Sequence, residues 1–119
     1  MEKKRKSLAH SFGCALQGIA AGIREERNMK IHCCAAAAVL GLGVWIGLSL
    51  MEWCICLILC GMVLALELVN SSLESLTDLV TQEWEPLAKK VKDLAAGAVL
   101  VGAVTAAAVG GIIFVPHFL

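Results

Sequence analysis

The sequence Trp53-Cys-Ile-Cys-Leu-Ile-Leu-Cys-Gly-Met-Val-Leu-Ala-Leu66 continues directly into Glu67-Leu-Val-Asn70-Ser-Ser-Leu-Glu74-Ser-Leu-Thr-Asp78. The first part carries no charge, whereas the second adds three carboxylates and one carboxamide without a break. On a helix that advances about 100° per residue, Glu74 and Asp78 fall within about 20° of Glu67. Asn70 lies about 60° behind Glu67. The stretch therefore predicts one long apolar helix that carries a single narrow acidic stripe.

Ionisable side chains at membrane depth are costly, and they usually face a bundle interior or a water-filled cavity. A functional site is one interpretation of the stripe. The other is a solvated helix end that projects past the bilayer surface. The solvated end suits Asp78 but not Glu67, which follows the apolar run immediately. We therefore treat the acidic stripe as a candidate functional site.

The composition is that of a membrane protein. Hydrophobic residues make up 59% of the 119 residues and the mean hydropathy is +0.80, whereas soluble domains contain roughly 45–50% apolar residues. The length allows one domain, 1–119. A net charge of zero argues against a nucleic-acid partner. The six cysteines lie in apolar or amphipathic stretches and are expected to pack as small hydrophobes, not as disulfides or zinc ligands.

Two further charge-free runs predict transmembrane helices. Residues 33–51 and 94–115 contain no charge, and each run is long enough to cross about 30 Å of hydrocarbon. Pro86 suits the first turn of the last helix, where its missing N–H is no loss. We expect spans at about 32–51, 53–80 and 86–116. Gly43 and Gly47 form a small-xxx-small pair, for which close helix packing and no packing role are equally open.

Residues 7–29 predict an amphipathic helix that lies in the plane of the membrane surface. Its apolar side chains recur on one face, as interfacial helices require. They are Leu8, Phe12, Ala15, Leu16, Ile19 and Ile23. Extended by one turn, this face reaches Glu26 and not Glu25, so Glu26 would need a partner in the membrane or the protein. The predicted fold class is all-α integral membrane, with this surface helix plus three transmembrane helices.

The basic residues predict the orientation. All ten Lys and Arg fall between Lys3 and Lys30 or between Lys89 and Lys92. With three spans, these two regions lie on the same side of the membrane. The positive-inside rule then places the N-terminus and the acidic stripe in the cytoplasm and the C-terminus outside.

The cytoplasmic end gathers acidic, amide and basic side chains from three helices. They are Glu26, Glu67, Asn70, Glu74, Asp78, Lys92 and Asp93. Carboxylates with an amide oxygen suit Mg²⁺ held together with substrate phosphates, and lysine supplies a point charge to phosphate. A magnesium nucleotide at a membrane surface is one reading, and an ion-paired network that anchors helices is the other. Gly13-Cys-Ala-Leu-Gln-Gly18 has P-loop spacing but is followed by Ile19-Ala20 in place of Lys and Ser or Thr.

Two segments resemble the small bacterial diacylglycerol kinases. The first is the acidic stripe Glu67-x-x-Asn70-x-x-x-Glu74-x-x-x-Asp78, and the second is Ala88-Lys-Lys-Val-Lys92-Asp93-Leu-Ala-Ala-Gly97. The segment Glu26-Arg-Asn-Met-Lys-Ile-His32 is most similar to the Gram-positive undecaprenol kinase branch of that family. The resemblance extends from the surface helix to the third span.

The resemblance implies a homotrimer in the bacterial inner membrane that uses ATP and Mg²⁺ to phosphorylate a lipid hydroxyl. It implies that Glu67 is the catalytic base and contacts the lipid, and that Glu26 and Glu74 are metal ligands. The implied ATP-binding residues are Glu26, Asn70, Glu74, Asp78, Glu83, Trp84, Glu85, Lys92 and Asp93. Near Ser7 the better-known diacylglycerol kinases carry an arginine, a position that Arg5 or Lys6 would have to fill.

We therefore predict an integral-membrane lipid kinase that favours undecaprenol over diacylglycerol. A diacylglycerol kinase proper is the nearest alternative. A small proton-coupled multidrug-type exporter also places a carboxylate in a short helical chain, but it commonly has four spans. A purely structural membrane protein leaves the acidic stripe unexplained.

Overall fold

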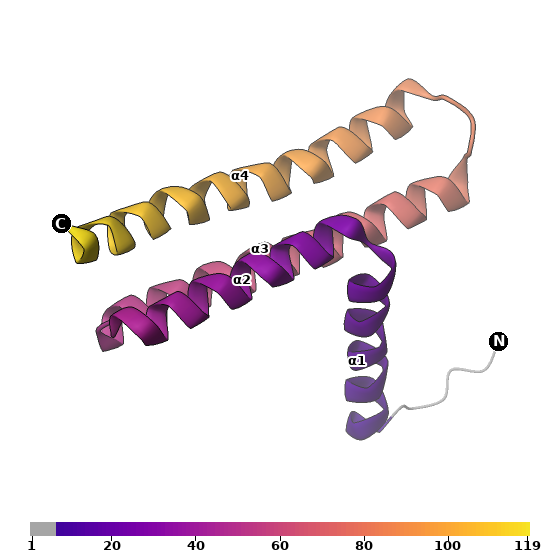
Figure 1. Cartoon of the computed structure of the whole chain (residues 1–119). Coiled ribbons are helices and arrows are strands. Elements are labelled where there is room, and N and C mark those ends of the chain that lie inside the picture. Colours follow the sequence, from indigo (N-terminus) through magenta and orange to yellow (C-terminus); the bar gives the residue numbers. More distant parts are fainter. Residues whose placement is uncertain (1–6) are drawn as a thin grey trace.

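The computed structural model describes residues 7–119, which form four helices (Figure 1). The helices are α1 (Leu8–Glu25), α2 (Arg27–Ile46), α3 (Leu50–Val80) and α4 (Pro86–Phe118). By length and hydropathy, α2, α3 and α4 are each able to cross a membrane. The chain is therefore an all-helical membrane protein, as its composition predicts.

Helix α3 is the centre of the bundle, because it packs against α4 most extensively and also contacts α2 and α1. At about 1.5 Å per residue its 31 residues extend about 46 Å, so it is longer than the hydrocarbon core. The α2–α3 turn and the C-terminus lie at one end of the bundle, and the α1–α2 junction lies toward the other (Figure 1). The long α3 thereby carries the acidic stripe toward the α1–α2 junction and the α3–α4 loop.

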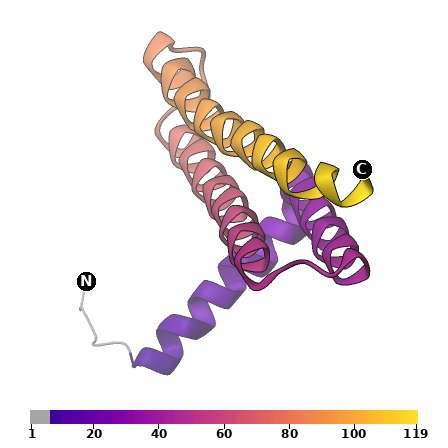
Figure 2. The ribbon, with the colours of Figure 1, turned by 90° about the vertical axis from the view of Figure 1, so that its left-hand side faces the viewer.

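Helix α1 begins after Ser7, whose side chain accepts a hydrogen bond from the His10 backbone N–H at 3.1 Å. It projects away from the other three helices in both views (Figures 1 and 2). Its apolar side chains are largely uncovered within the chain, since Leu8 and Leu16 are 75% and 65% exposed. Gly22 is the point of close approach to α3, where an added Cβ would lie 2.7 Å from Leu68 Cδ2.

The α1–α2 junction corrects the predicted end of the surface helix. The helix stops at Glu25, because Glu26 takes the extended conformation with φ −106° and ψ 120°. The helical projection that placed Glu26 on the apolar face therefore does not apply at that residue. Glu26 is nevertheless half-buried while Glu25 is exposed. The two side chains therefore differ in burial, as expected.

The turn between α2 and α3 lies earlier in the chain than the sequence suggested, because α2 ends at Ile46 and not near residue 51. Gly47 ends α2 in the left-handed conformation with φ 82°, which glycine adopts without a Cβ clash. Ser49 and Glu52 then form a capping box that starts α3 at Leu50, three residues before the predicted start. Gly47 is thus a helix terminator, whereas Gly43 is the crowded position, 2.8 Å from Leu48 Cδ1 and 3.1 Å from the Trp53 ring for an added Cβ.

Small residues let α3 and α4 approach closely. An added Cβ on Gly102 would lie 2.7 Å from Leu66 Cδ1. Pro86 occupies the first turn of α4, as predicted. At the opposite end, His117 Nε2 lies 3.1 Å from Glu52 Oε2, which ties the last turn of α4 to the first turn of α3.

Candidate active site

Glu67 is the most buried polar residue of the described chain, with 1% of its surface exposed. Its Oε2 has no hydrogen-bond partner. His32 on α2 lies beside it, with Nε2 3.6 Å from that oxygen. This separation exceeds hydrogen-bonding distance. A buried carboxylate oxygen therefore lies beside an imidazole without a hydrogen bond.

Asn70 lies one turn further along α3 and is 5% exposed. Its side-chain Oδ1 likewise lacks a hydrogen-bond partner. Buried polar atoms are nearly always paired, and leaving one unpaired costs about 1–3 kcal/mol. Two oxygens on one helix face are thus buried without a hydrogen-bond donor.

The acidic stripe becomes more accessible toward the end of α3. Glu74 is half-buried and Asp78 is exposed. Between them, the Thr77 hydroxyl donates to the Leu73 carbonyl of its own helix at 2.7 Å. Lys92 of α4 donates to Asp78 Oδ1 at 2.7 Å. Lys92 and the acidic stripe, which were expected at the same end of the molecule, are joined through Asp78.

Glu26 joins α1 to α2 and is half-buried. It occupies the N-cap position of α2, but its side chain makes no capping hydrogen bond. The carboxylate is therefore not used to cap the helix. Among residues 7–119, no group of three His, Cys, Asp or Glu side chains is placed to hold a metal ion. A cation here would rest on one or two carboxylates together with phosphate oxygens, as Mg²⁺ commonly does.

The remaining predicted nucleotide contacts surround the α3–α4 loop. Glu83, Trp84 and Glu85 are exposed in that loop, with the Glu83 N–H donating to Thr81 Oγ1 at 3.2 Å. Asp93 is exposed and accepts a hydrogen bond from Lys89 at 2.6 Å. Within the described residues, none of these side chains is hydrogen-bonded to the buried pair Glu67 and Asn70. Arg5 and Lys6 lie outside the described residues.

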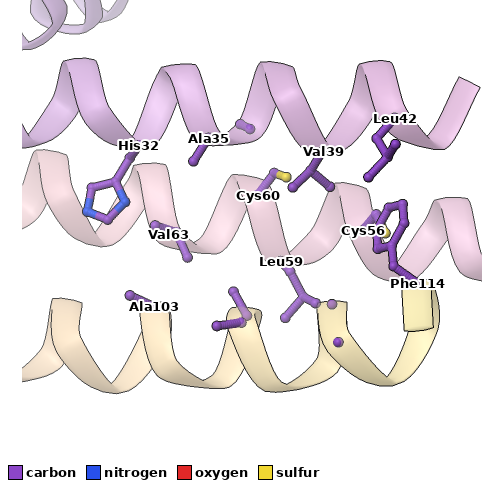
Figure 3. Close-up of a pocket in the computed structure, with 15 residues that line it drawn as sticks. His32, Ala35, Val39, Leu42, Cys56, Leu59, Cys60, Val63, Ala103 and Phe114 are labelled. Carbon is purple, nitrogen blue, oxygen red and sulfur yellow. The ribbon is translucent and has the colours of Figure 1, made fainter. Parts of the chain in front are cut away.

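A cavity of about 530 Å³ lies between α2, α3 and α4 (Figure 3). His32 is at one end, and Leu42, Cys56 and Phe114 are at the other (Figure 3). Apart from the imidazole, the lining side chains are alkyl, aromatic or thiol groups, and glycines add to the wall. The apolar cavity therefore ends at the histidine that faces Glu67.

His32 is the site residue that the sequence reasoning missed. Its position, two residues after Lys30 at the start of a charge-free run, gives a weak signal, because many spans begin with a polar residue. What identifies it is the packing of α2 on α3, which brings Nε2 toward Glu67. Only the tertiary structure joins the two residues.

The family model for prokaryotic diacylglycerol kinases matches residues 13–114. The chain belongs to this family. An undecaprenol kinase of Bacillus subtilis is 46% identical over 106 residues, which cover 89% of this chain and 86% of that protein. A diacylglycerol kinase of a Synechocystis species is 37% identical over 114 residues, which cover 95% of this chain and 65% of that protein. A diacylglycerol kinase of Helicobacter pylori is 31% identical over 97 residues, covering 82% of this chain and 76% of that protein.

These findings confirm the resemblance identified from the acidic stripe and the Lys92-Asp93 segment. The chain is a lipid kinase of the prokaryotic diacylglycerol kinase family.

Proposed function

We propose that this family member is an ATP- and Mg²⁺-dependent lipid kinase that favours undecaprenol over diacylglycerol. The observation that carries the proposal is Glu67, a buried carboxylate with an unpaired oxygen. It lies 3.6 Å from His32, which stands at the end of an apolar cavity. A lipid alcohol has a hydroxyl for the carboxylate and a tail for the cavity. The preference for undecaprenol is supported by the name of the 46% identical relative.

In the proposed mechanism, Glu67 is the general base. Its free oxygen accepts the proton of the lipid hydroxyl, whose oxygen forms a bond to the γ-phosphorus of ATP. The bond from that phosphorus to the bridging oxygen breaks, and ADP leaves with the electron pair. Phosphoryl transfer relies mainly on positioning and charge stabilisation, and base catalysis adds about 10²–10⁴-fold.

Glu26 and Glu74 are the proposed metal ligands. Both are half-buried, and the Glu26 carboxylate makes no helix-capping hydrogen bond. Their carboxylates, with the unpaired amide oxygen of Asn70 nearby on α3, are hard oxygen donors of the type that Mg²⁺ prefers. When bound, the ion neutralises phosphate charge.

The nucleotide is proposed to lie over the cytoplasmic end of α3 and α4. Its contacts are Asn70, Asp78, Lys92, Asp93 and the loop residues 83–85, together with the two metal ligands. Lys92 hydrogen-bonds to Asp78 at 2.7 Å, but it is 41% exposed, so it remains accessible to a phosphate. Exchange of one anionic partner for another costs little at such an exposed position.

We further propose that the chain lies in the bacterial inner membrane as a homotrimer, with the site in the cytoplasm and the C-terminus outside. The distribution of Lys and Arg supports the orientation. Helix α1 would lie on the membrane surface, where its exposed Phe12 and Leu16 would contact lipid. Assembly is supported by the thin core of the single chain, in which only six hydrophobic residues of the described part are buried.

Transfer of labelled γ-phosphate from ATP to lipid in mixed micelles tests the proposal. We expect the purified protein to phosphorylate both lipids, with the higher kcat/KM for undecaprenol. A higher kcat/KM for diacylglycerol would favour a diacylglycerol kinase proper, as several relatives are named. Transfer to neither lipid would contradict the proposed function.

A further inference from the structure

We propose that Gly22, Met29 and Leu68 form a joint that fixes α1 and α2 against α3 and thereby positions the Glu26 carboxylate. This inference rests on the proposed function, in which Glu26 is a ligand of the metal ion. The three residues act through Glu26, so they are positioning residues and not catalytic ones.

Glu26 is the single residue between α1 and α2. Its backbone N–H donates to the Gly22 carbonyl at 3.0 Å, and its own carbonyl accepts from the Lys30 backbone N–H at 3.2 Å. One backbone group of Glu26 is therefore bonded to each helix, whereas its carboxylate makes no capping hydrogen bond. The place of the carboxylate thus depends on how the two helices are held relative to α3.

Helix α1 is held against the bundle by its last turn. Gly22 is the one buried residue of α1, and the rest of the helix projects away from the other three (Figures 1 and 2). A Cβ added to Gly22 would lie 2.7 Å from Leu68 Cδ2, well inside the 3.5–4.0 Å that two carbon atoms prefer. A larger residue at this position therefore has to push α1 and α3 apart or displace the Leu68 side chain.

Met29 completes the joint from α2. Its side chain is 2% exposed, and it shares with Glu67 the rank of largest fully buried side chain in the described part of the chain. Its Cγ lies 3.9 Å from the same added Cβ on Gly22. One residue each from α1, α2 and α3 thus meets at one point. Because Glu26 lies between Gly22 and Met29 in the sequence, this contact holds the chain on both sides of Glu26.

Leu68 connects the joint to the acidic stripe. It follows Glu67 directly, and Glu74 lies six residues further along α3, about 9 Å at 1.5 Å per residue. Movement of the joint against α3 therefore moves Glu26 relative to both carboxylates. Loss of a residue that orients a metal ligand typically costs 10–100-fold in metal affinity, so the packing at Gly22 should control metal binding.

Binding of Mn²⁺ tests the inference without turnover. Mn²⁺ takes the same oxygen ligands as Mg²⁺, and its EPR signal measures the bound fraction in the presence of a non-hydrolysable ATP analogue. Gly22→Val should lower the Mn²⁺ affinity about tenfold, because the branched side chain forces α1 away from Leu68. Gly18→Val is the matched control on the same helix, since Gly18 has no atom within 4 Å of an added Cβ. It should bind Mn²⁺ as the wild type does.

A compensating change separates the joint from general damage to the fold. Leu68→Ala removes the atom that the valine meets, so Gly22→Val combined with Leu68→Ala should regain Mn²⁺ affinity to within about threefold of the wild type. Leu68→Phe enlarges the same contact from the side of α3 and should lower the affinity as Gly22→Val does. It takes the place of Gly22→Val if that protein does not fold.

Mn²⁺ affinity within twofold of the wild type in folded Gly22→Val or Leu68→Phe would overturn the inference. A loss that persists in the combined variant would overturn it as well, because it indicates disruption of the fold and not of this contact. Failure of the proposed function has a different signature. In that case the unchanged protein neither binds Mn²⁺ with the nucleotide nor transfers phosphate to lipid.

Discussion

Glu67 Oε2 and Asn70 Oδ1 are buried oxygens without donors, and they lie one turn apart on α3. Neither stabilises the chain by itself, because each loses its contact with water and gains no hydrogen bond in return. Their burial makes sense if a ligand supplies the donors. We therefore predict that substitutions of Glu67 and Asn70 lower the activity without lowering the stability of the fold.

Asn70→Leu separates the two effects. Replacing an unpaired buried amide with an apolar side chain of similar size should leave the thermal unfolding temperature unchanged or raise it. Phosphate transfer should fall by at least tenfold, because the site loses an oxygen donor. Unfolding temperature and lipid phosphorylation of the same preparation measure both. A marked loss of stability would show that Asn70 is structural.

Glu26 and Glu74 are tested by the metal requirement. Glu26→Gln and Glu74→Gln each remove one anionic ligand, so the Mg²⁺ concentration for half-maximal activity should rise several-fold. Excess Mg²⁺ should recover part of the rate. Glu25→Gln is the matched control, because Glu25 is exposed beside the half-buried Glu26. An identical Mg²⁺ requirement in all three variants would refute the assignment.

At the scale of the elements, the hydrophobic runs predicted the three long helices. A single segment that crosses a bilayer has to satisfy its own backbone hydrogen bonds, and a helix does so. The ends were less predictable. Nothing in the pattern marks Glu26 as extended, since glutamate is a good helix former. The early start of α3 was readable in principle, because Ser49 followed three residues later by Glu52 is a capping-box sequence.

Gly47 gives the most specific test of an element boundary. Its φ of 82° is favourable only for glycine, so Gly47→Ala should lower the free energy of unfolding by about 1–2 kcal/mol. Gly41→Ala is the control, because Gly41 lies within α2 with open space around it. Denaturant unfolding in micelles compares the two. Equal stability of both variants would contradict the terminating role of Gly47.

At the scale of the whole molecule, the sequence predicted which chemical groups gather at one end but not how they pair. The stripe and Lys92 were both expected there, and the Asp78–Lys92 hydrogen bond joins them. The contact of His32 with Glu67 depends on the rotation of α2 against α3, which helical periodicity within one segment does not determine. The cavity likewise arises only from three helices together.

The distribution of Lys and Arg predicts the orientation of the protein in the membrane. A reporter active only in the cytoplasm should work when fused to the N-terminus and fail at the C-terminus. A reporter active only outside should show the reverse. Cytoplasmic activity at the C-terminus would contradict the three-span topology. It would also contradict the placement of Glu52 and His117 at the outer surface.

The kcat of Glu67→Gln at saturating ATP and lipid tests the central claim most directly. Glutamine preserves shape and polarity but does not accept a proton at neutral pH, so the account predicts a fall of about 10²–10⁴-fold. ATP affinity and the unfolding temperature should remain near those of the wild type, which separates catalysis from folding. A folded Glu67→Gln protein within tenfold of wild-type kcat would contradict the assignment of Glu67 as the base.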